Sequence, residues 1–198
     1  MVLDLLVGDW LYPYTNSHLV GEHAVLTANS REEFQGIVLH LSITFGRPMN
    51  KDVNCWMLLV NDLCGQAVQA HKLVLQSSGL QHRDFIGLTE VCCVVEKLID
   101  SDQLKQSNLF NVGAGVSKSV LAMAQLIRQR CTKVLGFTPV LQYKKSSIDE
   151  QSATLTYHTD NLSALGIICK SQIKTVEIDK LLQFCQMSFI HKNSLEHE

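Results

Sequence analysis

Apolar and polar residues alternate along this chain with two different periods. Segments with an apolar residue at every third or fourth position are typical of helices that bury one face. They predict helices at residues 18–33, 55–70, 89–99, 120–131 and 176–189. Short runs of β-branched, aromatic and aliphatic residues lie between these segments and indicate strands. They predict strands at residues 37–43, 72–76, 84–86, 108–112, 139–143 and 153–157.

The order of these elements points to a fold class. Strands that alternate with helices favour an α/β fold in which at least some strands pair in parallel. Ser119 stands directly before the helix predicted at residues 120–131. A serine at this place commonly caps the first turn through its hydroxyl, so we predict that Ser119 is an N-cap.

Composition and charge narrow the kinds of partner. The 198 residues carry a formal net charge of -2, and 46% of them are hydrophobic. This balance favours neither nucleic acid nor an anionic membrane as a partner, and apolar runs such as residues 56–60 and 91–95 are too short to span a bilayer. The seven cysteines include no C-x-x-C pair, which favours small core thiols in a reducing cytoplasm. The eight histidines show no zinc-binding spacing, so no metal site is predicted.

Tyr14 and His18 form the most distinctive local pattern. They lie four residues apart, a spacing that places both side chains on one face of a helix. A positive charge beside a phenol favours the phenolate, which can act as a base. A tyrosine at the start of a helix is also commonly a packing residue. The spacing alone leaves both interpretations open.

The segments that follow extend this pattern into a series of motifs. Tyr14, Ser17 and Glu22 occupy matching places in Tyr-x-x-Ser-Lys-x-x-x-Glu, with His18 at the place of the lysine. Further matches, in order, are residues 37–48 to R-x-x-N-V-Y-G-P, 82–86 to R-D-F-V/I, 109–115 to F-N-V/I-G-S/T-G and 160–166 to D-x-S-K-A-x-x-L-G. In this order the chain resembles the NAD-dependent sugar-nucleotide epimerases and dehydratases, the extended branch of the short-chain dehydrogenase/reductase family.

The resemblance implies a fold and a division of the chain. The expected α/β fold consists of the back half of a Rossmann-like sheet and a small C-terminal substrate-binding subdomain. Residues 1–75 would hold the last part of the sheet with the tyrosine-bearing helix, residues 76–190 mainly the substrate-binding subdomain, and residues 191–198 a tail. The N-terminal dinucleotide-binding half of the family has no counterpart in this sequence.

The resemblance also implies roles for individual residues. Tyr14 would be the acid/base group of an oxidoreductase or isomerase that acts on a nucleotide sugar by epimerisation, dehydration or reduction. His18, in the place of the family lysine, would contact the nicotinamide ribose of NAD or NADP and lower the pKa of the tyrosine. Arg83 would contact the substrate diphosphate. The alternative for Arg83 is a structural ion pair with Asp84 or Glu90, and the two interpretations are evenly matched.

Several departures from the family pattern support a second hypothesis. His18, His40 and Ile43 replace a lysine, an arginine and an asparagine, and residues 1–13 contain no serine or threonine to complete a catalytic triad. The chain could therefore be a degenerate, non-catalytic relative that acts by binding or by dimerising. For either hypothesis we expect a homo-oligomer or a separate N-terminal half as partner, and no bound NAD or NADP on this chain alone.

The glycine-rich stretch Gly113-Ala-Gly115 requires its own interpretation. It follows a predicted strand and precedes a predicted helix, which is the setting of a phosphate-binding turn. Lys118 stands where a third glycine or an alanine would be required. A tight turn between strand and helix is therefore the favoured interpretation.

Overall fold

The structure is a computed structural model that describes residues 13–101, 108–145, 154–169 and 174–190. Helices and strands alternate along the chain, as predicted. The helices are α1 (Pro13–Ser30), α2 (Leu59–Ala70), α3 (Leu88–Ile99), α4 (Val120–Leu135), α5 (Asp160–Ala164) and α6 (Lys174–Phe189). The strands are β1 (Val38–Leu41), β2 (Ile43–Phe45), β3 (Lys72–Val74), β4 (His82–Gly87), β5 (Leu109–Val112), β6 (Ser117–Ser119) and β7 (Val140–Gln142). The predicted tail at residues 191–198 lies outside the described residues.

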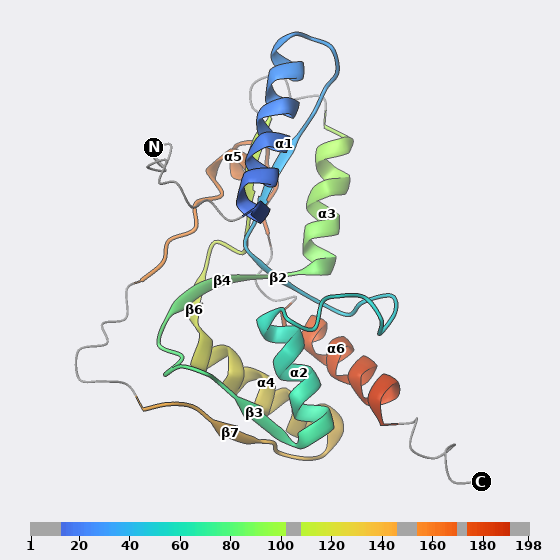
Figure 1. The fold of residues 1–198 in the computed structure, drawn as a ribbon, viewed down its shortest axis with the longest axis vertical. Coiled ribbons are helices and arrows are strands. Elements are labelled where there is room, and N and C mark those ends of the chain that lie inside the picture. Colours follow the sequence, from blue (N-terminus) through green and yellow to red (C-terminus); the bar gives the residue numbers. More distant parts are fainter. Residues whose placement is uncertain (1–12, 102–107, 146–153, 170–173, 191–198) are drawn as a thin grey trace.

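One half of the molecule is built on a parallel strand pair. β1 pairs with β5 in register, with Val38 opposite Leu109 and Leu41 opposite Val112. Helices α1, α3 and α5 lie around this pair in the upper part of Figure 1. The core of this half joins apolar residues of α3, β5 and α5 to Ile86 of β4. Parallel strands joined through helices are the pattern expected of an α/β sheet.

The other half is a helical layer that covers two short parallel strands. Helices α2, α4 and α6 pack on one another, and β3 pairs with β7 beside them (Figure 1). Their apolar faces form a second core, which includes Leu63 of α2, Ile127 of α4 and Leu181 of α6. Local signals fix the ends of α4, because the Ser119 hydroxyl accepts the Ala122 amide at 3.1 Å and Gly136 adopts the left-handed conformation at the C-cap. The predicted N-cap is thereby confirmed.

A third set of strands connects the two halves. β4 lies between β2, to which it pairs in parallel, and β6, to which it pairs antiparallel. Phe85 of β4 belongs to the helical core, whereas the adjacent Ile86 belongs to the core around β5. The buried Glu177 of α6 adds a polar link, since its carboxylate accepts the Thr89 hydroxyl of α3 at 2.6 Å. Each core includes residues from both sides of residue 75. The expected division there, between the sheet part and the substrate-binding subdomain, stays a prediction.

Four expectations about the elements need correction. α1 begins at Pro13 instead of residue 18, consistent with the preference of proline for the first helical turn. The strand predicted at residues 37–43 is interrupted at Ser42, where the chain passes from β5 as partner to β4. β6 was not predicted, and residues 154–157 form no strand. In that segment Tyr157 binds through its side chain, not through a ladder of backbone hydrogen bonds.

The cysteines divide into buried and exposed groups. All seven are free thiols, and Cys64, Cys131 and Cys185 are buried in the helical core, as expected for small apolar residues. Cys92 and Cys93 are exposed on α3, contrary to that expectation. Burial raises the pKa of the Cys131 and Cys185 thiols to about 12. These two cysteines are therefore protonated, unreactive thiols at neutral pH.

Candidate functional site

Tyr14 and His18 lie together at the start of α1, as their spacing predicts. Their ring centroids are 4.1 Å apart, and the rings are tilted by 34°. The Nδ1 atom of His18 lies 2.8 Å from the backbone oxygen of Tyr14. A carbonyl oxygen can only accept, so Nδ1 of His18 donates in this contact. The Tyr14 side chain is 73% exposed, so its hydroxyl is accessible to a ligand.

A cavity of about 400 Å³ lies between α1 and β1. Its α1 side includes Ser17, His18 and Glu22, and its β1 side ends at His40. A hydrogen bond joins the two sides, since Nε2 of His40 lies 2.8 Å from a Glu22 carboxylate oxygen. Tyr14 is not among the lining residues, but its ring lies against that of His18, which lines the cavity.

Asp84 holds the turn between β5 and β6 from inside the protein. Its side chain points away from solvent, with 2% of the residue exposed. One carboxylate oxygen accepts the Ala114 amide at 2.8 Å, and the other accepts the Val116 amide at 3.1 Å. Such charge-assisted bonds are about twice as strong as neutral ones. Asp84 therefore fixes the path of the chain from β5 into β6.

Tyr157 connects this turn to the strand beneath α1. Its hydroxyl donates to the backbone oxygen of His40 at 2.9 Å. Burial, and then the nearby Asp84 carboxylate, raises the pKa of Tyr157. A Cβ atom at Gly113 would lie 2.5 Å from the Tyr157 ring, so the ring closes directly over the turn. Sequence reasoning missed Tyr157, because it placed this residue in a strand.

Arg83 lies on the opposite face of β4 from Asp84. Its guanidinium donates through Nη1 to the backbone oxygen of His82 at 2.9 Å, and its side chain is exposed. The expected alternatives, ion pairs with Asp84 or Glu90, do not form among the described residues. Adjacent residues of a strand point to opposite faces. This alternation was the signal that could have excluded the pairing with Asp84.

The glycine-rich turn at residues 113–115 does not fit the pyrophosphate of a dinucleotide. A phosphate at such a turn needs free backbone amides at the start of a helix, but Asp84 already accepts the amides of Ala114 and Val116. The turn also leads into β6, and α4 begins only at Val120. The favoured interpretation, a tight turn, agrees with this geometry.

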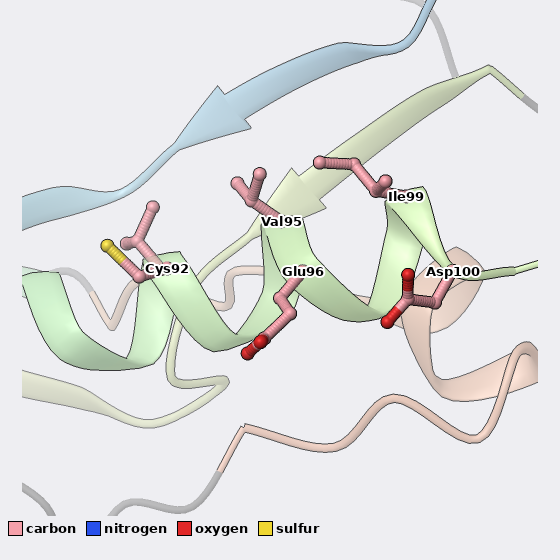
Figure 2. A pocket seen from close by; sticks show the side chains of 6 residues that line it. Cys92, Val95, Glu96, Ile99 and Asp100 are labelled. Atoms are coloured by element: carbon pink, nitrogen blue, oxygen red, sulfur yellow. The ribbon is translucent and has the colours of Figure 1, made fainter.

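A second cavity, of about 480 Å³, lies along α3 and is shown in Figure 2. The side chains of Cys92, Val95 and Ile99 form its apolar part, and Glu96 and Asp100 form an acidic rim. Two carboxylates beside an apolar surface repel a nucleotide diphosphate. This cavity is therefore not the candidate site for the substrate that the sequence resemblance implies.

A series of contacts through His40, Tyr157 and Asp84 connects the helix that carries Tyr14 to the strand that carries Arg83. Tyr14 lies on α1, which the Glu22–His40 hydrogen bond joins to β1. The backbone of His40 binds Tyr157, which lies over the turn that Asp84 holds. Arg83 is the neighbour of Asp84 in β4. These contacts link the two segments and do not by themselves place Tyr14 and Arg83 in one cleft.

The described residues also bear on metals and membranes. Within them, no three or more His, Cys, Asp or Glu side chains gather in a way that could bind a metal ion. None of the helices described for this chain combines the length and the apolar character needed to cross a bilayer.

Known proteins resemble this chain in fold only. No protein-family model matches the sequence, and no curated protein matches it. Among solved structures, UDP-N-acetylglucosamine 4-epimerase from Methanobrevibacter ruminantium, in complex with UDP-N-acetylmuramic acid, has a TM-score of 0.68 at 17% identity. That match covers 96% of this chain and 59% of the epimerase chain.

Two further structures show the same relation. UDP-glucuronic acid 4-epimerase from Bacillus cereus, in complex with UDP-glucuronic acid and NAD, has a TM-score of 0.66 at 16% identity over 89% of this chain and 53% of its own. dTDP-glucose 4,6-dehydratase from Bacillus anthracis, in complex with NAD, has a TM-score of 0.65 at 15% identity over 91% and 54%. The chain spans between half and three fifths of the length of these proteins. The α/β fold implied by the sequence resemblance is that of part of these nucleotide-sugar enzymes, and it is confirmed.

Proposed function

We propose that this chain is the substrate-binding region of an NAD- or NADP-dependent nucleotide-sugar epimerase or dehydratase, with Tyr14 as its acid/base group. The observation that carries the proposal is the pair at the start of α1. An exposed phenol lies 4.1 Å, ring to ring, from an imidazole that can be charged. This pair occurs in a fold shared with NAD-dependent enzymes that act on nucleotide sugars.

The proton-transfer half of such a reaction needs a phenolate that can accept a sugar hydroxyl proton. A protonated His18 would stabilise the phenolate of Tyr14 through its positive charge. Arg83 would hold the substrate diphosphate, because a guanidinium offers donors in a geometry suited to phosphate oxygens.

The glycine-rich turn at residues 113–115 does not fit the pyrophosphate of NAD, so a complete enzyme would need a dinucleotide-binding part from elsewhere. We expect such an enzyme to work in the cytoplasm and to form a dimer or larger homo-oligomer. Helix α1 supports the second expectation, because it has no buried residue and exposes Leu19 and Val20.

Tyr14→Phe should lower the rate of epimerisation or dehydration at least about a hundredfold in a protein completed with a dinucleotide-binding part. The substitution deletes one exposed hydroxyl, so the melting temperature should not change. Product formation from UDP-glucose or dTDP-glucose, followed by chromatography, gives the rate. His18→Lys should raise the rate, because a permanent positive charge stabilises the phenolate more strongly.

Tyr143→Phe is the matched control, since Tyr143 is another exposed tyrosine that follows β7. It should leave the rate unchanged. Equal rates for wild type and Tyr14→Phe, in a protein that is active, would contradict the acid/base assignment.

One observation favours a second candidate function. His18 stands where the family carries lysine, and α1 exposes apolar side chains. A degenerate, non-catalytic relative that acts as a binding or dimerisation module would have these features. If the completed protein has no activity with either substrate, this second function is preferred.

A further inference from the structure

Two cations face each other across β4 and β6. In the antiparallel register Arg83 lies opposite Lys118. The Val120 amide donates to the backbone oxygen of Gln81 at 3.0 Å. This bond lies two residues along the ladder, so Arg83 and Lys118 form a hydrogen-bonded pair with a Cα separation of about 5.5 Å. Their side chains therefore leave the same face of the strand pair.

This arrangement is unfavourable without a counter-ion. Like charges directly opposite each other destabilise a strand pair. Among the described residues, no carboxylate forms an ion pair with Arg83 or Lys118. The nearest acid in sequence, Asp84, points to the other face, where it accepts two backbone amides. No direct ion pair among the described residues therefore neutralises either positive charge.

The same turn that Asp84 fixes also sets the place of Lys118. The carboxylate binds the amides of Ala114 and Val116, immediately before β6 begins at Ser117. At the other end of β6, the Ser119 hydroxyl caps α4. The backbone around Lys118 is thus held at both ends, which fixes its Cα atom in register opposite that of Arg83.

We infer that Lys118 and Arg83 form one anion site for a diphosphate group, with Lys118 as the second binding residue. The inference rests on the proposed function, in which Arg83 alone contacts the substrate diphosphate. The guanidinium has further N–H donors beyond the one bound to His82, and the ammonium of Lys118 has three. A diphosphate, with charge on two linked phosphates, suits two cations better than a single phosphate does.

Binding of pyrophosphate to the chain tests the inference directly. Isothermal titration should show that Lys118→Gln weakens pyrophosphate binding about tenfold, as expected for the loss of one charge-assisted bond. Arg83→Gln should weaken it at least as much. UDP should show the same loss, and orthophosphate should bind less tightly than pyrophosphate. Lys72→Gln is the matched control, because Lys72 is an exposed strand lysine opposite the uncharged Val140.

Stability without ligand gives a second readout that a merely structural lysine would not produce. Lys118→Gln should raise the melting temperature by about 1–3 °C in the absence of phosphate, since it removes a like-charge pair. Millimolar pyrophosphate should then raise the melting temperature of the wild type and not that of the variant. A lower melting temperature for the variant without ligand would overturn the inference.

The outcomes separate this inference from the proposed function. If Arg83→Gln abolishes pyrophosphate binding while Lys118→Gln leaves it unchanged, the two-cation site is wrong and the role of Arg83 stands. If both variants weaken binding while Tyr14→Phe keeps full activity, the site stands and the catalytic assignment fails. If the wild type binds no pyrophosphate at millimolar concentration, the inference is overturned.

Discussion

Asp84→Ala should lower the free energy of unfolding by about 3–5 kcal/mol. The side chain is buried, and its carboxylate accepts two backbone amides of the turn between β5 and β6. Alanine would leave the amides of Ala114 and Val116 without their acceptor, and the cost of an unsatisfied buried donor adds to that of the lost charge-assisted bonds. Urea unfolding followed by circular dichroism measures the change.

Asp52→Ala is the control for this prediction. The Asp52 side chain is 75% exposed, and its carboxylate approaches Lys51 only at 3.9 Å. Its removal should change stability by less than about 0.5 kcal/mol. Asp84→Ala should also weaken pyrophosphate binding, because β6 carries Lys118 and depends on the turn. A loss of stability below about 1 kcal/mol would show that the turn holds without Asp84.

Phe110→Ala should cost about 3–5 kcal/mol, as expected for the truncation of a buried aromatic side chain. Phe110 is 1% exposed in the core around β5. We expect one cooperative transition for wild type and variant, although the residue belongs to one core only. Adjacent residues of β4, Phe85 and Ile86, enter the two different cores, so neither core can open without disturbing that strand.

Phe34→Ala provides the comparison, because Phe34 is a half-exposed aromatic residue in the segment between α1 and β1. Phe34→Ala should lower the free energy of unfolding by only a small fraction of the loss expected for Phe110→Ala. Two separate transitions in Phe110→Ala, with the second at the midpoint of the wild type, would mean that the helical core unfolds independently. Calorimetry distinguishes one transition from two.

The spacing of apolar residues predicted best those elements whose backbone hydrogen bonds form within the element itself, which are the helices. The pattern of apolar residues predicted α2, α3, α4 and α6 to within a few residues, since a helix satisfies its backbone locally and shows its buried face in the sequence. Short strands were predicted less well. β6 is only three polar residues long, and nothing in its own sequence distinguishes it from a loop.

The candidate site was predicted in part. Tyr14 and His18 share a helix face because both belong to one helix, so their spacing of four residues was sufficient to predict it. A motif singled out Arg83. Its cross-strand partner, Lys118, was noted only as a departure from a glycine pattern. The two residues are 35 positions apart in sequence, and only the register of β4 against β6 brings them together.

The sequence by itself determined the α/β class, the order of helices and strands, the cap at Ser119 and the resemblance in fold to the nucleotide-sugar enzymes. The tertiary structure alone decided that the Asp84 carboxylate binds the glycine-rich turn and does not pair with Arg83. It also decided that Tyr157 closes over Gly113 and that Arg83 and Lys118 lie opposite each other across a strand pair. The physical reason is the range of the interactions. Periodicity and capping act over a few residues, whereas strand register and the partners of buried polar groups depend on segments that only the folded chain brings into contact.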